Sequence, residues 1–167
     1  MDIRVGFGFD VHQLHDGQDF IIGGVHIEHR KGAVGHSDAD VLIHAICDAL
    51  LGAANLKDIG THFPDSDGKY ENIDSSILLN NVIGLLSKEG YSINNIDSTV
   101  CLEAPKIKPY IASMQEHLSE IMKLDVDRIS IKATTSEKMG FVGREEGVTA
   151  YATVLIQKPS ASSSSSS

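Results

Sequence analysis

Residues 147–158 (GVTAYATVLIQK) constrain the fold most strongly, because they form a strand-like segment with apolar side chains on both of its faces. One face carries Val148, Ala150, Ala152 and Val154, and the other carries Tyr151 and Leu155. A strand of this kind belongs in a sheet whose two faces are both covered. We expect helices of the chain to cover one face and other subunits to cover the second.

The remaining strand-like segments are short and scattered along the chain. Alternating apolar and polar residues predict strands at 3–11, 96–103 and 128–133. Residues 20–27 predict a hairpin that turns at a pair of glycines, and residues 31–35 are expected to be loop.

Helical spacing of apolar residues predicts three helices. The first begins after a cap at Ser37 or Asp38, the second runs from a cap at Asp74 to a stop at Gly90, and the third opens at Pro109. The mixed order of elements predicts an α+β fold, a mixed β-sheet covered on one face by helices.

Length and composition favour a single α+β domain over residues 1–158, followed by a Ser-rich tail, 159–167, that we expect to be disordered. The formal net charge of -9 disfavours nucleic acid and anionic membranes as partners. No apolar run approaches the ~18 residues of a membrane helix, and no signal peptide is visible. Cys47 and Cys101 lie outside any CxxC motif, so we interpret them as buried thiols in a reducing, cytoplasmic compartment.

The stretch GFGFDVHQLHDG (6–17) places Asp10 and His12 two residues apart in a strand-like segment. Residues i and i+2 of a strand point to one face, roughly 6–7 Å apart, so both side chains can reach one divalent cation. A hydrogen-bonded pair at a strand end is the alternative.

The first predicted helix offers a third ligand. Asp40, His44 and Asp48 form a polar stripe that borders its apolar face. His44 is either a satisfied core histidine or the third ligand of a site with an open fourth position, as catalytic zinc requires. Asp48 is then placed to orient a ligand.

Two loops could bind anions or hydroxyl groups. His36 and Ser37 stand where the chain enters this helix, and helix N-termini bind phosphate; an ordinary cap and surface loop is the alternative. In the irregular segment 57–67, Asp58, Asp65 and Asp67 either bind hydroxyls or form Asx-turns.

Two further stretches carry polar groups of interest. Lys106 and Lys108 form a basic island that meets an anion or is simply solvated. Thr134 and Glu137 match a capping box, yet no helical run follows, and a Thr-Thr pair plus a carboxylate suits phosphate oxygens and Mg²⁺. Arg144 offers a forked donor to phosphate or to a buried Glu.

Taken together, four blocks resemble the 2-C-methyl-D-erythritol 2,4-cyclodiphosphate synthase family. They are GFDVH (8–12), GHSDADVLIHAICDALLGAANLKDIGTHFPDSD (35–67), APK (104–106) and KATTSEKMGFVGREEG (132–147). The resemblance spans about residues 3–156.

The resemblance implies a metal-dependent enzyme of the non-mevalonate isoprenoid pathway, a phosphorus-oxygen lyase. It would cyclise 4-diphosphocytidyl-2-C-methyl-D-erythritol 2-phosphate to 2-C-methyl-D-erythritol 2,4-cyclodiphosphate and release CMP. It also implies a cytoplasmic homotrimer whose sheets pack around a central axis, with active sites between subunits and a channel that can hold an isoprenoid diphosphate.

The resemblance also implies roles for individual residues. Asp10, His12 and His44 match ligands of one Zn²⁺ per subunit, and Glu137 matches a ligand of Mg²⁺ or Mn²⁺ bound with the substrate diphosphate. Glu137, Thr135 and Asp48 are implied to be catalytic. The implied substrate-binding residues are His36 and Ser37 at the attacking phosphate, Asp58 and Gly60 near the ribose, Asp65 at the erythritol hydroxyls, Leu102, Lys106, Ile107 and Lys108 around cytidine, and Ala133, Thr134, Thr135, Phe141 and Arg144.

Two other functions fit parts of the pattern. Two His and one carboxylate also bind ferrous iron for oxygen chemistry, although three helices argue against the all-β scaffolds usual there. A metal or cytidine-nucleotide binding protein without turnover is the other alternative, but it would not need the separate Thr134, Thr135 and Glu137 cluster.

Overall fold

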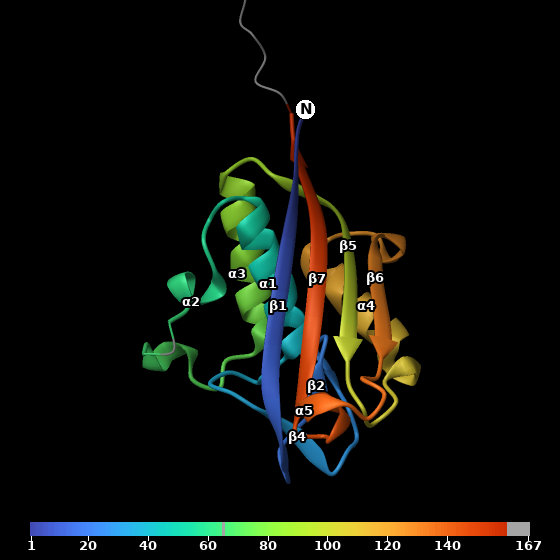
Figure 1. The fold of residues 1–167 in the computed structure, drawn as a ribbon. Coiled ribbons are helices and arrows are strands. Elements are labelled where there is room, and N and C mark those ends of the chain that lie inside the picture. Colours follow the sequence, from blue (N-terminus) through green and yellow to red (C-terminus); the bar gives the residue numbers. More distant parts are fainter. Residues whose placement is uncertain (65, 160–167) are drawn as a thin grey trace, which may run out of the picture.

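The computed structural model describes residues 1–64 and 66–159, and it confirms a mixed α+β fold. Its five-stranded sheet has the order β4-β1-β7-β5-β6 (Figure 1). β5 and β6 are parallel, and the other neighbouring pairs are antiparallel. The strand bounds are β1 Asp2–Asp16, β4 Lys31–Val34, β5 Ser92–Cys101, β6 Ile129–Thr134 and β7 Gly147–Lys158, with a separate hairpin of β2 Ile21–Ile22 and β3 Val25–His26.

Helices cover one face of this sheet, as predicted (Figure 1). The three long ones are α1 (Val41–Ala53), α3 (Ser75–Lys88) and α4 (Ile111–Met122). Two single-turn helices, α2 (Ile59–His62) and α5 (Gly140–Gly143), lie in the connecting segments. Among the described residues, no helix is long and apolar enough to cross a membrane.

Two glycines let α1 lie directly against β1. A Cβ at Gly6 would stand 1.9 Å from the carbonyl oxygen of Ala49, and one at Gly8 would stand 1.9 Å from that of Ala45. The alternation GFGF therefore puts the smallest residues under the helix and the large ones on the opposite face. Because Asp10 and His12 continue the row of Gly6 and Gly8, they too point toward α1.

The opposite face of the sheet is apolar and exposed in the single chain. It carries Phe7, 63% exposed, and Val5, 66% exposed. Ile3, Phe9, Val11 and Tyr151 are also exposed there. The second apolar face expected from residues 147–158 is therefore confirmed, and it is broader than that strand alone.

Several local predictions were wrong. Residues 31–34 form β4 because Gly32 packs tightly on the carbonyls of residues 18 and 19, which brings this edge segment alongside β1. The α1 cap is Asp40, whose carboxylate accepts from the Ile43 amide, and not Ser37 or Asp38. Cys101 is only half-buried.

Short helical turns also occur where irregular chain was expected. α2 interrupts the segment predicted to be loop because the Asp58 carboxylate caps it by accepting from the Thr61 amide. α5 follows the Thr134 and Glu137 segment, and Pro109 stands in a 3₁₀ turn (108–110) just before α4. Asp65 and residues 160–167, the bulk of the predicted tail, lie outside the described residues.

Candidate metal centre and substrate pockets

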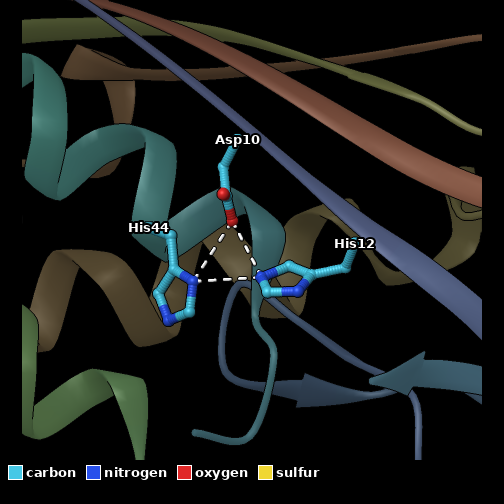
Figure 2. A group of neighbouring side chains, drawn as sticks. All are labelled: Asp10, His12 and His44. Carbon is cyan, nitrogen blue, oxygen red and sulfur yellow. Dashed lines mark hydrogen bonds and ion pairs between the residues drawn. The ribbon is translucent and has the colours of Figure 1, made fainter. Parts of the chain in front are cut away.

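Asp10 and His12 from β1 meet His44 from the first turn of α1 (Figure 2). Asp10 Oδ2 lies 2.9 Å from His12 Nε2 and 3.1 Å from His44 Nδ1. The two ring nitrogens are 3.2 Å apart. The three residues predicted to share a metal are thus brought together, and no other group of three or more His, Cys, Asp or Glu residues within 1–64 and 66–159 has this potential.

These separations fit a small divalent cation. A tetrahedron with metal–ligand bonds of about 2.0–2.1 Å has edges of roughly 3.3 Å, close to the distances among the three donor atoms. The second nitrogen of the His12 ring, Nδ1, lies 3.0 Å from the Val34 carbonyl oxygen and donates its proton there. That bond leaves the Nε2 lone pair of His12 facing the other two donors.

The two imidazole rings stabilise the ionised form of Asp10. Burial alone would raise the pKa of Asp10, but the ring nitrogens of His12 and His44, within hydrogen-bond distance of its carboxylate, outweigh burial and lower the pKa to about 2. Burial opposes protonation of His12, yet its bond to Asp10 raises the pKa of the ring above the ordinary value. Asp10 therefore remains an anionic ligand at neutral pH.

His44 is held from its far side by two hydroxyl groups that the sequence analysis did not connect with it. Its Nε2 lies 2.9 Å from Ser75 Oγ and 3.0 Å from Ser37 Oγ. Ser75 in turn donates to Asp38. The Asp38 in GHSDAD and the Ser75 that opens α3 were visible in the sequence, but nothing in either segment indicated that they meet.

The other two acids of the predicted helix stripe have different partners. Asp40 is fully buried and accepts hydrogen bonds from the amides of Gly23, Gly24 and Ile43. Burial raises its pKa to about 6. Asp48 accepts from the Ile59 amide at 3.2 Å, so it ties α2 to α1; a catalytic role for Asp48 stays a prediction.

A cavity of about 370 Å³ opens beside the triad. Three residues predicted to bind substrate, His36, Ser37 and Gly60, lie in its lining. Its apolar wall consists of Ile59, Phe63, Tyr70, Ile73 and Leu78. Asp58 lies outside this lining and caps α2, and Asp65 lies outside the described residues. We call this cavity the metal pocket.

A second cavity, of about 310 Å³, lies where β5 and β6 end. We call it the edge pocket. It brings together every residue predicted around cytidine, since its lining consists of Leu102, Glu103, Pro105, Lys106, Ile107, Lys108, Ala133, Thr134 and Thr135.

Glu137 follows the edge pocket in an exposed, unusual backbone conformation. Glu137 and Lys138 both have positive φ, 54° and 60°. The Glu137 amide donates to Thr135 Oγ1 at 3.2 Å. Gly143 permits this turn, since a Cβ there would stand 2.1 Å from the Lys138 carbonyl carbon. The strained turn presents the Glu137 carboxylate to solvent.

Phe141 and Arg144 lie near the end of the exposed sheet face. Phe141 lines a third cavity of about 480 Å³ together with Val11 and Glu146. The Arg144 guanidinium donates to Glu146 at 2.8 Å. The Glu partner of Arg144 is exposed, so the buried Glu predicted as one of its two partners is not what the structure has.

The metal pocket and the edge pocket have no lining residue in common. The metal pocket adjoins β1, whereas the edge pocket adjoins β5 and β6, with β7 between them. A single chain thus separates the triad from the Thr135 and Glu137 cluster.

This combination defines a class of protein: an α+β fold with a half-buried candidate metal centre of two histidines and one carboxylate, and a separate pocket at the far edge of its sheet. The chain belongs to the YgbB family, whose model matches residues 3–157. The resemblance inferred from the sequence is thereby confirmed.

Named relatives and solved structures agree with this family. The chain is 63% identical over 158 residues to 2-C-methyl-D-erythritol 2,4-cyclodiphosphate synthase of Bacteroides fragilis, covering 95% of this chain and 99% of that protein. The structure is similar to IspF of Plasmodium falciparum in a CDP complex, with TM-score 0.83, 32% identity and coverage of 95% and 97%. It also matches the bifunctional IspDF of Campylobacter jejuni, with TM-score 0.91 and 40% identity, covering 95% of this chain and 43% of that one.

Proposed function

We propose that this protein converts 4-diphosphocytidyl-2-C-methyl-D-erythritol 2-phosphate to 2-C-methyl-D-erythritol 2,4-cyclodiphosphate and CMP in the non-mevalonate isoprenoid pathway. The convergence of Asp10, His12 and His44, in a chain 63% identical to a protein of that name, carries the proposal. An oxygen of the 2-phosphate attacks the β-phosphorus, and the bond from that phosphorus to the oxygen bridging to CMP breaks. The activity is therefore of the phosphorus-oxygen lyase class.

In this proposal Asp10, His12 and His44 hold one Zn²⁺. When bound, the ion supplies a Lewis acid that neutralises charge on the β-phosphate. His36 and Ser37, which line the same pocket, donate to the attacking phosphate. The apolar wall around Phe63 and Leu78 excludes water from the reacting groups.

The edge pocket is proposed to bind cytidine. Leu102 and residues 106–108 surround the base, while Thr134 and Thr135 contact the phosphates. Asp58 and Gly60 contact the ribose, and Asp65 contacts the erythritol hydroxyls. The CDP complex of the Plasmodium falciparum relative supports a cytidine nucleotide as ligand.

Glu137 is proposed to hold Mg²⁺ or Mn²⁺ together with the substrate diphosphate. Such an ion supplies further positive charge where two phosphates must approach each other. The exposed, positive-φ turn at Glu137 and the hard carboxylate support this assignment.

A homotrimer is proposed because one chain keeps its two pockets at opposite sides of the sheet. Packing three copies through the exposed apolar face would cover Phe7, Phe9 and Tyr151 and would bring the metal pocket of one copy to the edge pocket of the next. Arg144 and Glu146 would then line a central channel that can take an isoprenoid diphosphate. Sedimentation velocity tests the state: a trimer is expected, and a monomer would contradict it.

Phosphorus NMR of the substrate with the protein tests the reaction. CMP together with a coupled pair of cyclic diphosphate signals is expected, lost with chelator and restored by zinc plus magnesium. CMP without the cyclic product would indicate a hydrolase, and unchanged substrate would indicate a binding protein.

A cytoplasmic location also stays a proposal, which cell fractionation would test.

A further inference from the structure

We propose that Asp38 and Ser75 form a hydrogen-bond relay that fixes the tautomer of His44 and so prepares the metal centre; this inference rests on the proposed function of that site. Neither residue is one of the three proposed metal ligands, Asp10, His12 and His44. Ser75 is fully buried at the start of α3, and Asp38 lies two residues before the α1 cap.

The directions of the bonds follow from the number of protons. The Ser75 hydroxyl donates to one Asp38 oxygen, and the Ser75 amide donates to the other at 3.0 Å. A hydroxyl has one proton, so Ser75 Oγ has only lone pairs left for His44 Nε2, 2.9 Å away. The contact with Ser75 therefore favours the ring proton on Nε2.

Two carboxylates compete for that proton in the metal-free protein. Asp10 Oδ2 lies 3.1 Å from His44 Nδ1 and favours a proton there, which would block metal binding. Asp38, acting through Ser75, favours the proton on Nε2 and leaves the Nδ1 lone pair facing Asp10 and His12. Asp38 and Ser75 are therefore positioning residues for a metal ligand.

The same relay affects Ser37. Its Oγ lies 3.0 Å from His44 Nε2 and accepts from the Ala39 amide at 3.3 Å. Because a protonated Nε2 can only donate, the Ser37 hydroxyl proton is not used on His44. It is left to donate into the metal pocket, where an anionic group of the substrate would bind.

The neighbouring serine provides a matched control. Ser76 Oγ also bonds a histidine nitrogen, Nε2 of His117, at 2.8 Å. Ser75→Ala and Ser76→Ala therefore remove the same hydroxyl from the same turn of α3, and each loses a serine–histidine bond. Only Ser75→Ala removes a bond to a proposed metal ligand, His44.

The experiment measures Zn²⁺ affinity by chelator competition for wild type, Ser75→Ala, Asp38→Asn and Ser76→Ala. We expect roughly 10–100-fold weaker binding for Ser75→Ala, the usual effect of losing a ligand's outer partner, weaker binding for Asp38→Asn, and no change for Ser76→Ala. Equal affinities in Ser75→Ala and Ser76→Ala would overturn the relay. Thermal unfolding of the metal-free variants shows whether each one folds.

Imidazole ¹⁵N–¹H correlation spectra of the metal-free proteins, at a pH where His44 is neutral, give an independent readout. The relay predicts the Nε2–H tautomer in wild type and a shift toward Nδ1–H in Ser75→Ala and Asp38→Asn. An Nδ1–H tautomer in wild type, or unchanged spectra in both variants, would contradict it. Failure of wild type to bind Zn²⁺ would instead count against the proposed function, and the tautomer would still decide the relay.

Discussion

The candidate site has two halves: the metal half, around Asp10, His12 and His44, and the nucleotide half, formed by the edge pocket and Glu137. The two halves differ in burial and in backbone conformation. In the metal half, His44 has a side-chain exposure of 13%, and its ring nitrogens lie within hydrogen-bond distance of Asp10, Ser37 and Ser75. In the nucleotide half, Glu137 is exposed and stands on a turn with positive φ. In the trimer that we propose, each chain completes a metal centre by itself, and the groups that bind the rest of the substrate come from another copy.

The largest effect is expected from the metal half. His44→Ala removes one of three converging donors, so zinc binding and turnover should both fall below detection while the oligomeric state stays the same. Metal content by mass spectrometry and the phosphorus NMR assay measure these. His117→Ala, which removes a histidine bonded to Ser76, is the control and should keep its zinc. Full activity in a metal-free His44→Ala protein would exclude the zinc assignment.

Glu137→Gln should lower turnover without affecting zinc binding, and so should distinguish the nucleotide half from the metal half. The side chain keeps its size but loses its charge, so zinc content should stay at the wild-type level while turnover falls about 10²–10³-fold, as for loss of one preorganised electrostatic group. Steady-state kinetics with saturating Mg²⁺ measure the loss. Glu120→Gln, on the exposed side of α4, should change nothing. Unchanged kinetics in Glu137→Gln would remove Glu137 from the mechanism.

Gly143→Ala tests whether the backbone of the nucleotide half matters as well as its side chains. The added Cβ would stand 2.1 Å from the Lys138 carbonyl carbon and would displace the Glu137 turn. We expect a loss of turnover smaller than that of Glu137→Gln, again with normal zinc content. Gly84→Ala, where nothing lies within 4 Å, is the control and should not lower activity. Equal turnover in Gly143→Ala and Gly84→Ala would show that activity does not depend on the backbone conformation at Glu137.

The smallest effect is expected at Asp40, the buried cap of the helix that carries His44. Burial raises the pKa of Asp40 to about 6, above the roughly 3.9 of an unfolded Asp, so the folded state binds this proton more tightly. The stability this group contributes is therefore present below about pH 4 and lost as pH rises through 6.

Asp40→Asn should remove this pH dependence from the free energy of unfolding. It should also lower the free energy of unfolding by about 1–3 kcal/mol, because an amide NH₂ cannot accept hydrogen bonds from the surrounding backbone amides. Denaturant unfolding of metal-free protein between pH 4 and 7 measures both effects. Asp127→Asn, at an exposed position, is the control. If the free energy of unfolding changed with pH in the same way in wild type and Asp40→Asn, the raised pKa of Asp40 would be contradicted.

The sequence predicted much of this molecule because local patterns determine it. The two-residue spacing of Asp10 and His12 required one face of a strand, and the apolar periodicity around His44 required a helix that packs on the sheet. The two-sided apolar strand at 147–158 predicted the exposed face. Each of these follows from residues close together in the chain.

What the sequence did not predict depends on contacts between distant segments. Ser75 reaches Asp38 across 37 positions, and β4 exists because Gly32 fits against the chain at residues 18 and 19. Asp40 looked like one member of a polar stripe, but the hairpin amides of Gly23 and Gly24 turn it into a buried cap. No local pattern encodes such partners.

The most direct test of a site divided between chains is to mix two inactive variants. His44→Ala and Glu137→Gln subunits, carrying different tags, are coexpressed, and oligomers containing both are purified and assayed. If each site takes its metal half from one chain and its nucleotide half from the next, each mixed trimer should have one intact site out of three, so the purified mixed oligomers should recover roughly a third of the wild-type activity. Mixed oligomers that stay as inactive as either parent would contradict the account.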